Sequence, residues 1–502
     1  MSERSNCLNC PNDRDLAYHL GLLKFGSEEE KFEEISLAPV FTQRMCSCHE
    51  SSPSRPTGEV SQYGLLAGIT KANGSYFSAS NETSTWGEDP RLFFNVSSPS
   101  STFICGSQGS GKSHTLSCIL ENCLIPSRAA KLPNPLTAVV FHYDTFICDN
   151  GGSPCEAAFL ASHPDIKVRV LCAPTNIRTI QGTYSRFNIT VEALQIDQKD
   201  LNTKRMLDLM AVGQTNGPLP LYMHTVQRIL REMRIVQQNM GTRFDYAEFK
   251  MRVLDSELTS GQLEPLKQRL DALESFMPAQ QAYKTGQKKG SQGWGSDWTP
   301  RSGQLTIVDL SCPCISSDTA CSLFNICFGI FLEQSTEIGR IVALDEAHKY
   351  MDSSVEAKSF TETLLSTVRL QRHLGIRIVI STQEPTISTA LLSLCSLTIV
   401  HRFSSPEWLR ALKSNIAAVA LGEDPLRGNH ENRENNDVDK SSLFDRIVRL
   451  RVGEALLFCP SAAIKPPSGS DEIEEIKKLG SGYLQVKVRS RLTEDGGRSV
   501  LS

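Results

Sequence analysis

The sequence predicts an α/β fold in which a central parallel sheet has helices on both faces. Short runs of β-branched and apolar residues alternate along the chain with stretches whose apolar residues recur at helical spacing. This alternation is typical of parallel strands joined by crossover helices. A glycine-rich segment that follows one apolar run, and two carboxylates that end another, fit the same arrangement.

Six segments are predicted to be strands buried on both faces, because their apolar character is nearly continuous. They are Thr102–Cys105, Thr137–Tyr143, Gln304–Leu310, Arg340–Leu344, Ile376–Ser381 and Leu397–His401. A further segment, Tyr483–Leu492, alternates apolar with polar residues and predicts a half-buried strand. We expect its basic residues Lys487, Arg489 and Arg491 to form the exposed face of an edge strand; the alternative is that they line the path of a polymer.

Two amphipathic stretches, Met223–Met240 and Phe244–Phe276, lie between the second and third of the buried strands. Their apolar residues recur at helical spacing. Since they interrupt the alternation of strands and crossovers, they predict an inserted helical subdomain over about residues 192–278. A Gly-rich and polar segment over residues 278–303 then predicts a mobile loop.

The composition excludes several classes of protein. Hydrophobic residues make up 40% and charged residues 22% of the chain, which argues against wholesale disorder, a collagen-like chain and a membrane protein. The formal net charge is −4. A polyanion would therefore have to contact a local surface or channel, because the protein as a whole is not basic.

Most of the sixteen cysteines stand singly within apolar runs, where a free thiol behaves as a small buried hydrophobe. This usage is typical of a reducing compartment. The N-terminal residues also lack the apolar core of a signal peptide. We therefore expect an intracellular protein, cytoplasmic or nuclear, that has no membrane contact.

The segment from residue 106 to residue 113 matches the pattern G-x-x-x-x-G-K-S/T. It follows a predicted strand and precedes a helical pattern, the context in which backbone N–H groups and a helix N-terminus bind phosphate. Lys112 would reach the β- and γ-phosphates of ATP, and the Ser113 hydroxyl would ligate Mg²⁺. The predicted nucleotide-binding residues are Gly106, Ser107, Gln108, Gly109, Ser110, Gly111, Lys112, Ser113 and His114.

Two further strand ends carry side chains suited to ATP hydrolysis. The predicted strand at residues 340–344 is followed by Asp345, which would hold Mg²⁺, and by Glu346, which would polarise the attacking water. The predicted strand at residues 376–381 leads to Gln383, an amide suited to hydrogen-bond the γ-phosphate or the water. The predicted catalytic residues are thus Glu346, Gln383 and Lys112, and the predicted metal ligands are Ser113 and Asp345.

These motifs resemble those of the HerA/FtsK class of P-loop ATPases. The matching segments are GSQGSGKS, IVALDEAHKYM, RHLGIRIVISTQEPT, HRFSSPEWLRAL and VGEALLFCPSA. The resemblance implies an additional-strand P-loop fold of the RecA/HerA kind, ATP and Mg²⁺ as cofactors, assembly into a ring that is usually a hexamer, and translocation of DNA through the pore. The C-terminal KVRSRLTEDGGRS is also similar to a tail of fungal ATPases.

In such rings an arginine of one subunit stabilises the transition-state charge at its neighbour's γ-phosphate. The candidates are Arg369, Arg372 and Arg402, and the family pattern favours Arg372 as the further catalytic residue. Two features depart from the family. Glu384 stands where a basic residue is usual, and the first 60 or so residues show no small β-barrel of the HerA kind.

Two other functions fit parts of the sequence. Residues 345–348 spell the DEAH tetrapeptide of RNA helicases, but too little chain follows residue 403 for the second RecA-like domain that those enzymes need. An ATP-gated scaffold or signalling switch that moves no polymer is the remaining alternative, and the near-neutral charge favours it. The presence of Glu346 argues against a switch that cannot hydrolyse ATP, because binding alone does not require this carboxylate.

The chain is expected to divide into three parts. These are a cysteine-containing N-terminal arm over residues 1–60, a P-loop ATPase domain over residues 61–465 that holds the helical insertion, and a C-terminal tail over residues 466–502 with the terminal strand. Four cysteines of the arm, Cys7, Cys10, Cys46 and Cys48, could complete a tetrahedral Zn²⁺ site. The close spacing of the second pair argues for a partly disordered arm without zinc.

Overall fold

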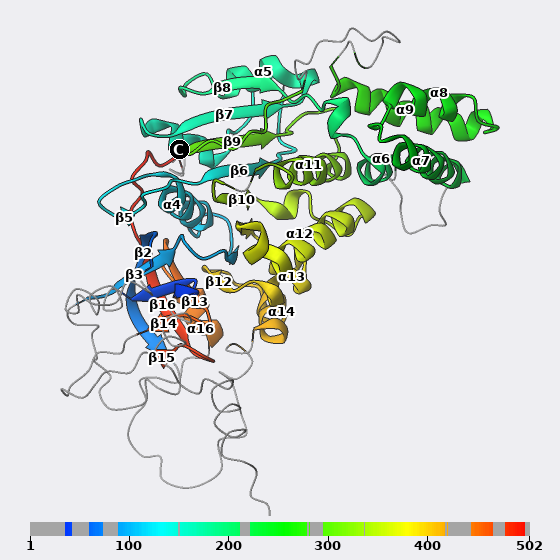
Figure 1. The fold of residues 1–502 in the computed structure, drawn as a ribbon. Helices are drawn as coiled ribbons and strands as arrows, with labels where there is room; N and C mark the ends of the chain where they lie inside the picture. The colour runs from blue at the N-terminus through cyan, green and yellow to red at the C-terminus, as the bar shows by residue number, and fades with distance from the viewer. Residues whose placement is uncertain are drawn as a thin grey trace, which may run out of the picture.

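The strands of the protein form one large sheet. The computed structural model describes residues 36–42, 60–73, 89–148, 151–210, 221–278, 281, 295–335, 337–416, 419, 443–464 and 477–496. Within these residues the sheet has sixteen strands (Figure 1). The candidate zinc ligands Cys7, Cys10, Cys46 and Cys48 lie outside the described residues.

Five neighbouring parallel strands carry the carboxyl ends at which the predicted site residues lie. In order across the sheet they are β12 (Leu397–Val400), β4 (Ser101–Cys105), β11 (Ile376–Thr382), β10 (Arg340–Leu344) and β6 (Thr137–His142). β11 therefore lies between β4, which leads into the phosphate loop, and β10, which leads to the acidic pair. This extra strand confirms the additional-strand arrangement that the motifs imply. The bounds of all five strands agree with the predicted ones to within one residue.

Three more parallel strands extend the sheet beyond β6. They are β9 (Gln304–Asp309), β7 (Lys167–Cys172) and β8 (Thr190–Ala193). The sequence predicts β9 but not the other two. β7 begins with alternating charged and apolar residues, and β8 has no fully buried side chain, so neither shows the continuous apolar run of a buried strand.

On the other side of β12 the sheet becomes antiparallel. The strands follow in the order β13 (Glu454–Phe458), β16 (Tyr483–Val488), β2 (Tyr63–Asn73), β3 (Arg91–Asn95) and β1 (Val40–Thr42). The short strands β5 (Ala130–Lys131), β14 (Ala463–Ile464) and β15 (Lys477–Lys478) complete this part.

The prediction that the C-terminal strand is an edge strand is wrong. β16 pairs with β13 on one side and with β2 on the other. Lys487 is exposed, but Arg489 and Arg491 follow the strand and have buried side chains. Alternation in a sequence shows that one face of a strand is buried, but it does not show whether the strand has one neighbour or two.

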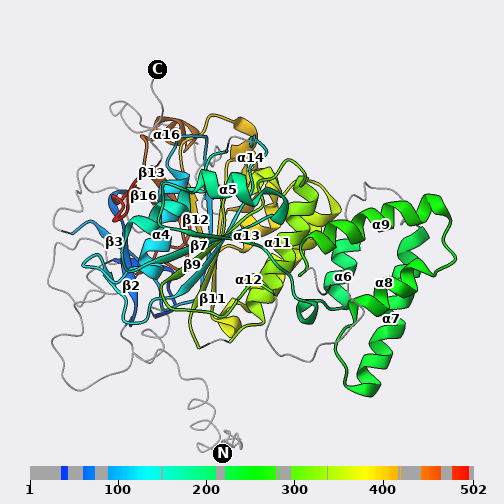
Figure 2. The ribbon, with the colours of Figure 1, turned by 90° about the horizontal axis from the view of Figure 1, so that it is seen from above.

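Helices cover both faces of the sheet, as predicted (Figure 2). One face packs against α4 (Lys112–Leu124), α5 (Ile177–Thr183) and the 3₁₀ helix η1 (Glu156–Ser162). The other face packs against α11 (Ser317–Leu332), α12 (Val355–Leu374), α13 (Thr389–Leu394), α14 (Pro406–Asn415) and α16 (Leu443–Arg449). Short 3₁₀ turns occur at η2 (Pro174–Asn176), η3 (Gln198–Asp200), η4 (Ala347–Lys349) and η5 (Pro385–Ile387).

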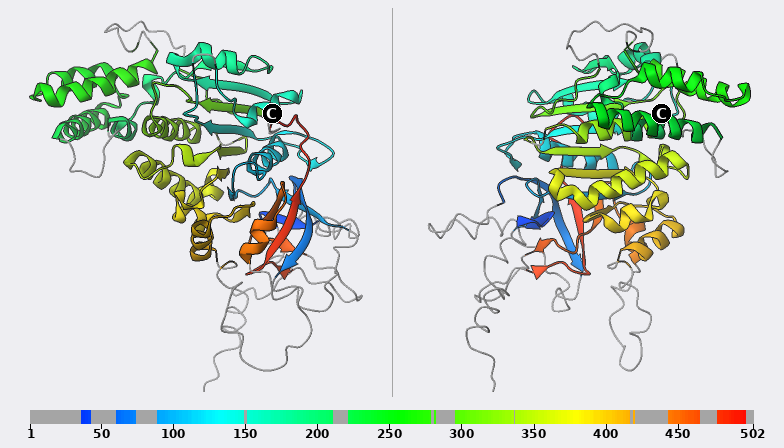
Figure 3. Two further views of the ribbon diagram at one scale, coloured as in Figure 1. Left: turned by 180° about the vertical axis from the view of Figure 1, so that it is seen from behind. Right: turned by 45° about the vertical axis from the view of Figure 1, so that its right-hand side comes forward.

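The described chain between β8 and β9 forms the predicted helical insertion. Its helices are α6 (Thr203–Met210), α7 (Leu221–Met240), α8 (Tyr246–Leu254) and α9 (Ser260–Ser275). They project beyond the sheet on the side of α11, as the two views in Figure 3 show. α6 contacts α11, and apolar side chains of all four helices join the core on that face.

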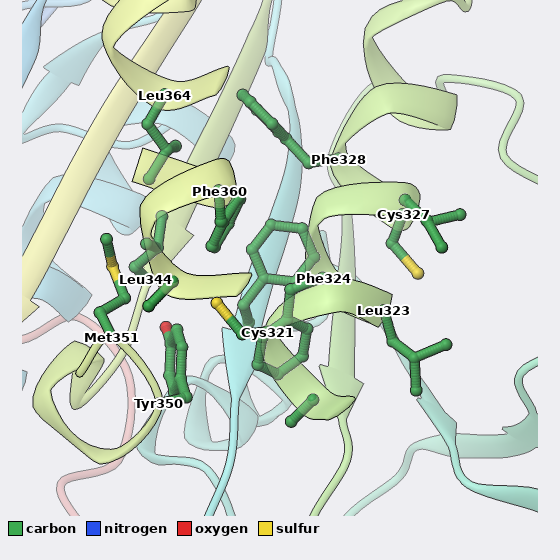
Figure 4. Close-up of a cluster of buried hydrophobic side chains, with 14 of the residues drawn as sticks. Cys321, Leu323, Phe324, Cys327, Phe328, Leu344, Tyr350, Met351, Phe360 and Leu364 are labelled. Carbon is green, nitrogen blue, oxygen red and sulfur yellow. The ribbon is translucent and has the colours of Figure 1, made fainter. Parts of the chain in front are cut away.

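The core between α11, α12 and the sheet supports the strand that ends in the acidic pair. α11 is apolar around most of its circumference, which fits its nearly complete burial. Phe324 lies beside Tyr350, which follows the acidic pair (Figure 4), and their ring centroids are 4.9 Å apart. The ring centroid of Phe324 also lies 4.9 Å from that of Phe141 on β6. Phe360 of α12 packs edge to face against Phe141 and Phe328. Close packing therefore fixes the backbone that follows β10.

Three further features bear on the sequence-based expectations. The twelve cysteines among the described residues are all free, and most of them are buried. None of the described helices combines the length and the apolar character needed to cross a membrane. Within the segment expected to form a loop, residues 295–303 are described, and Trp298 is buried against the helical core.

Candidate functional site

The phosphate loop connects β4 to α4 and is shaped by three glycines. Gly106, Gly109 and Gly111 have positive φ angles of 152°, 69° and 112°. A Cβ at residue 106 would lie 2.7 Å from Cβ of His401, so packing also excludes a side chain there. At Gly109 a Cβ would meet no described atom within 4 Å, so the loop faces open space. With the N-terminus of α4, which begins at Lys112, the loop can bind an anion.

The two residues that follow β12 contact the phosphate loop and the first turn of α4. The carbonyl oxygen of Arg402 accepts hydrogen bonds from the backbone N–H and the Oγ of Ser107, both at 2.8 Å. The Nδ1 of His401 lies 3.0 Å from the carbonyl oxygen of Glu454, and its Nε2 lies 2.9 Å from Oγ1 of Thr115. Because a carbonyl can only accept, Nδ1 carries the proton and Nε2 is left as an acceptor beside the Thr115 hydroxyl, which also donates to the carbonyl oxygen of Gly111 at 3.1 Å. Sequence analysis missed this role of His401, which no local pattern marks.

The stability of the protein should fall on acidification through His401. Burial lowers the pKa of His401 to about 4, whereas the pKa of a histidine in an unfolded chain is about 6.5. Between these values the unfolded state binds more protons than the folded state, so the free energy of unfolding decreases as the pH falls. When the pH falls from about 7 to about 5, the free energy of unfolding of His401→Gln should decrease by about 2 kcal/mol less than that of the wild-type protein, as measured by urea denaturation. An identical pH dependence in the two proteins would contradict this prediction.

Lys112 lies in the loop beside the carboxylates that follow β10. Its Nζ donates a hydrogen bond to the carbonyl oxygen of Ser107 at 3.1 Å. Burial lowers the pKa of the Lys112 ammonium, and the charges of Glu346 and Asp345 oppose that shift. The structure thus brings the lysine of the loop and the acidic pair of β10 to one place.

Asp345 is buried at the end of β10 and is held by the neighbouring strand. Its Oδ2 lies 3.2 Å from Nδ1 of His142, the last residue of β6, and 3.7 Å from Sγ of Cys155. Burial alone would raise the pKa of Asp345, but the hydrogen bond from His142 and the charge on that ring outweigh burial and lower the pKa below its usual value. Sequence analysis missed both of these neighbours, which come from other parts of the chain.

The acidic pair and the loop offer ligands that fit a hard cation. Oδ1 of Asp345 is buried and has no hydrogen-bond partner among the described residues. A buried carboxylate oxygen without a donor is costly unless a cation or its water ligands satisfy it. Ser113 lines the cavity beside the loop, together with Lys112 and Glu346. These residues therefore fit the Mg²⁺ that the motifs predict.

Glu346 has an unusual backbone and two side-chain neighbours. Its φ of 48° lies in the left-handed region, and it is the one non-glycine residue with positive φ among those described. Such strain is typical of functional sites. Its Oε2 accepts a hydrogen bond from Nε2 of Gln383 at 3.1 Å and lies 3.4 Å from Nδ1 of His348. Burial lowers the pKa of His348, and the charges of Glu346 and Glu384 oppose that shift.

A cavity of about 570 Å³ adjoins the loop. Its volume lies within the range of small-molecule sites and suits a nucleotide. The loop contributes residues 108, 109 and 111–114 to its walls, and Glu346 lines it as well. Residues 487–490 and Asp495 of the C-terminal segment also line it, a contribution that sequence analysis did not predict.

The candidate arginines and His114 lie at different ends of the parallel strands. Arg369 and Arg372 are exposed in the last turns of α12, which ends where β11 begins, at the edge opposite the loop. α12 has 20 residues and is about 30 Å long, so neither arginine reaches the loop of its own chain. Arg402 is exposed beside the loop. Nε2 of His114 lies 2.8 Å from the carbonyl oxygen of Arg489.

The order of the strands and the position of the loop define the class of protein. A glycine-rich loop joins β4 to α4, and the strand that ends in the acidic pair lies two places along the sheet, beyond β11. The chain therefore has the fold of a P-loop nucleoside triphosphatase with an additional strand.

Solved structures of three proteins resemble this chain. VirB4 of Thermoanaerobacter pseudethanolicus is 10% identical over 85% of this chain and 96% of its own, with a TM-score of 0.46. The plasmid coupling protein TrwB, in complex with a non-hydrolysable ATP analogue, is 14% identical over 83% of this chain and 95% of its own, with a TM-score of 0.42. The DNA-packaging ATPase B204 from Sulfolobus turreted icosahedral virus is 10% identical over 72% of this chain and 92% of its own, with a TM-score of 0.29.

Of these three structures, that of TrwB contains an ATP analogue, and B204 is described as a DNA-packaging ATPase. Neither a protein-family model nor a curated protein matches the sequence. The assignment of this chain to the P-loop nucleoside triphosphatases therefore rests on its own strand order and phosphate loop, and not on these similarities.

Proposed function

We propose that this protein is a Mg²⁺-dependent ATPase. The observation that carries the proposal is the hydrogen bond from Gln383 to Glu346 beside Lys112, at a cavity of nucleotide size. A protein that only binds nucleotide needs the loop and its lysine. Such a protein does not need a carboxylate, like that of Glu346, which the amide of Gln383 orients at the same cavity.

In this proposal each residue of the site has one task. The N–H groups of the loop and the Lys112 ammonium bind the phosphates of ATP, and Ser113 and Asp345 hold Mg²⁺. The bound cation would neutralise charge on the β- and γ-phosphates. Glu346 accepts a proton from the attacking water, and Gln383 orients that carboxylate through its Nε2–H group. His142 keeps Asp345 ionised and leaves Oδ1 free for the cation.

We further propose that the ATPase is a ring-forming DNA translocase of the HerA/FtsK type, with a hexamer as the expected ring. The motif resemblance supports this function, and an exposed Arg372 far from its own loop is suited to act on a neighbouring subunit. An ATP-gated scaffold or signalling switch is the alternative. The net charge of −4 fits both functions, since a translocase needs positive charge only along its pore.

ATP turnover and assembly separate the two functions. We expect the purified protein to hydrolyse ATP with Mg²⁺, to do so faster with single- or double-stranded DNA, and to form a closed ring with a non-hydrolysable ATP analogue in electron micrographs. Turnover that no DNA stimulates, with no ring at any protein concentration, would favour the switch. A protein without any Mg²⁺-dependent turnover would refute the ATPase proposal itself.

A further inference from the structure

Three buried side chains from distant parts of the chain meet at the carboxyl ends of the parallel strands. They are His142 at the end of β6, Cys155 just before η1, and Asp345 just after β10. Each offers one ligand atom, and the nitrogen, the sulfur and the oxygen all lie within 4.8 Å of one another. Imidazole nitrogen, thiolate sulfur and carboxylate oxygen are the atoms that bind Zn²⁺ in proteins.

The spacing of these atoms fits a tetrahedral cation. Oδ2 of Asp345 lies 3.2 Å from Nδ1 of His142 and 3.7 Å from Sγ of Cys155. Bonds of about 2.0 Å to nitrogen or oxygen and about 2.3 Å to sulfur put the ligand atoms of a tetrahedral Zn²⁺ about 3.3–3.7 Å apart. These two distances therefore already match a zinc site closely, and a water molecule could supply the fourth ligand.

The hydrogen bonds within the cluster leave two of its polar atoms unsatisfied. Nε2 of His142 and Oδ1 of Asp345 are buried and have no hydrogen-bond partner among the described residues. A buried polar network that served packing alone would be expected to pair such atoms, since an unpaired one has lost its hydration without compensation. The cluster thus has more capacity for ligands than its internal hydrogen bonds use.

Neighbouring groups hold Cys155 in place. Its N–H group donates to the hydroxyl of Tyr184 at 2.9 Å, and that hydroxyl donates to Oδ2 of Asp309 at 2.7 Å. Contacts of this kind orient the ligands of a metal site. Burial raises the pKa of the Cys155 thiol to about 11, so the thiol keeps its proton until a cation displaces it.

The cluster adjoins the cavity beside the phosphate loop. Glu156 and Glu346 follow Cys155 and Asp345 directly in the chain, and both of these glutamates line the cavity. A dissolved cation therefore has a path to ligands that are themselves buried.

We propose that His142, Cys155 and Asp345 form a binding site for Zn²⁺ that is separate from the proposed Mg²⁺ site. The two sites would use different oxygens of one carboxylate, Oδ2 for Zn²⁺ and Oδ1 for Mg²⁺. They would select different cations, because Mg²⁺ prefers oxygen ligands alone whereas Zn²⁺ binds thiolate. The zinc site goes beyond the proposed function and does not depend on ATP hydrolysis.

Titration with Co²⁺ tests the proposal, because a thiolate bound to Co²⁺ absorbs strongly in the near ultraviolet. The full-length protein is used with serine in place of the four cysteines of the N-terminal arm, so that these cannot contribute: Cys7, Cys10, Cys46 and Cys48. We expect the absorption to reach its plateau at about one Co²⁺ per chain, with a Kd of about 10 µM or less. Zn²⁺ should remove the absorption by displacing Co²⁺, and a large excess of Mg²⁺ should leave it in place.

Three variants in this background assign the ligands. Cys155→Ala should abolish the absorption, and His142→Gln should raise the Kd for Co²⁺ at least about tenfold. Cys327→Ala is the matched control, because Cys327 is also completely buried but belongs to the core on the opposite face of the sheet. It should keep both the absorption and the Kd. Urea denaturation shows whether each variant is folded.

An absence of Co²⁺ absorption in the parent protein would overturn the proposal, and so would absorption that survives Cys155→Ala. If Cys155→Ala does not fold, His142→Gln decides, because it keeps every thiol and an unchanged Kd would overturn the proposal. Loss of the absorption on addition of Mg²⁺ would overturn the separation of the two sites. A protein that binds Co²⁺ in this way but never hydrolyses ATP would refute the proposed function and leave the zinc site standing.

Discussion

Glu346→Gln should lower the turnover number for ATP by at least about 100-fold while ATP still binds. The amide has the shape of the carboxylate and can remain beside Gln383 in the same largely buried position. The amide cannot accept a proton from water, so the hydrolysis step should slow while nucleotide binding is retained. Turnover with Mg²⁺ gives the first quantity, and titration with a non-hydrolysable ATP analogue gives the second.

Two further variants serve as controls for this experiment. Glu384→Gln changes an exposed carboxylate that adjoins Gln383 in sequence, and turnover should stay close to that of the wild type. Lys112→Ala removes the ammonium of the loop and should weaken nucleotide binding itself. If Glu346→Gln hydrolysed ATP at the wild-type rate, another group would have to accept the proton and the assigned base would be wrong.

Glu121→Ala should reduce the free energy of unfolding by about 3–5 kcal/mol. The carboxylate of Glu121 is completely buried and accepts hydrogen bonds from two N–H groups, one hydroxyl and the guanidinium of Arg489. Its removal would leave a guanidinium with 8% exposure without its partner charge, together with unsatisfied donors of Leu492 and Thr493. Urea denaturation measures the loss.

Glu362→Ala is the matched control for the change at Glu121. Glu362 is exposed on α12, and its replacement should change the stability by less than about 0.5 kcal/mol. Glu121→Gln keeps the shape and one acceptor oxygen, so its effect should fall between the two. A loss below about 1 kcal/mol in Glu121→Ala would mean that the hydrogen bonds of Arg491 and Gly496 with Glu156 of η1 hold the segment after β16 without help from α4.

Much of the sheet could be predicted because its signals are local. Each strand of the parallel core from β12 to β6 is a nearly continuous apolar run, and burial on both faces favours that composition. β7 and β8 could not be predicted in this way, since their side chains are partly exposed. The position of β16 between β13 and β2 depends on long-range pairing, which its own alternation does not encode.

In the candidate site, too, short sequence patterns mark some residues and not others. Lys112, Asp345, Glu346 and Gln383 follow strands or a glycine-rich turn, so short sequence patterns mark them, and the parallel register gathers them at one edge. His142, which holds Asp345, is an ordinary strand-ending residue in the sequence. It acquires its role only because β6 lies next to β10.

The sequence by itself determined the class of fold and marked the residues that we propose to bind phosphate and Mg²⁺, because a phosphate loop and a strand that ends in two carboxylates need only neighbours in the chain. Only the tertiary structure decided what else lines the cavity beside the loop. Glu121 and Leu492 are 371 residues apart, yet they share a hydrogen bond that holds the segment after β16 beside the cavity. The packing of β16 beside β2 and α4 creates that contact, and long-range packing leaves no periodic signal in a sequence.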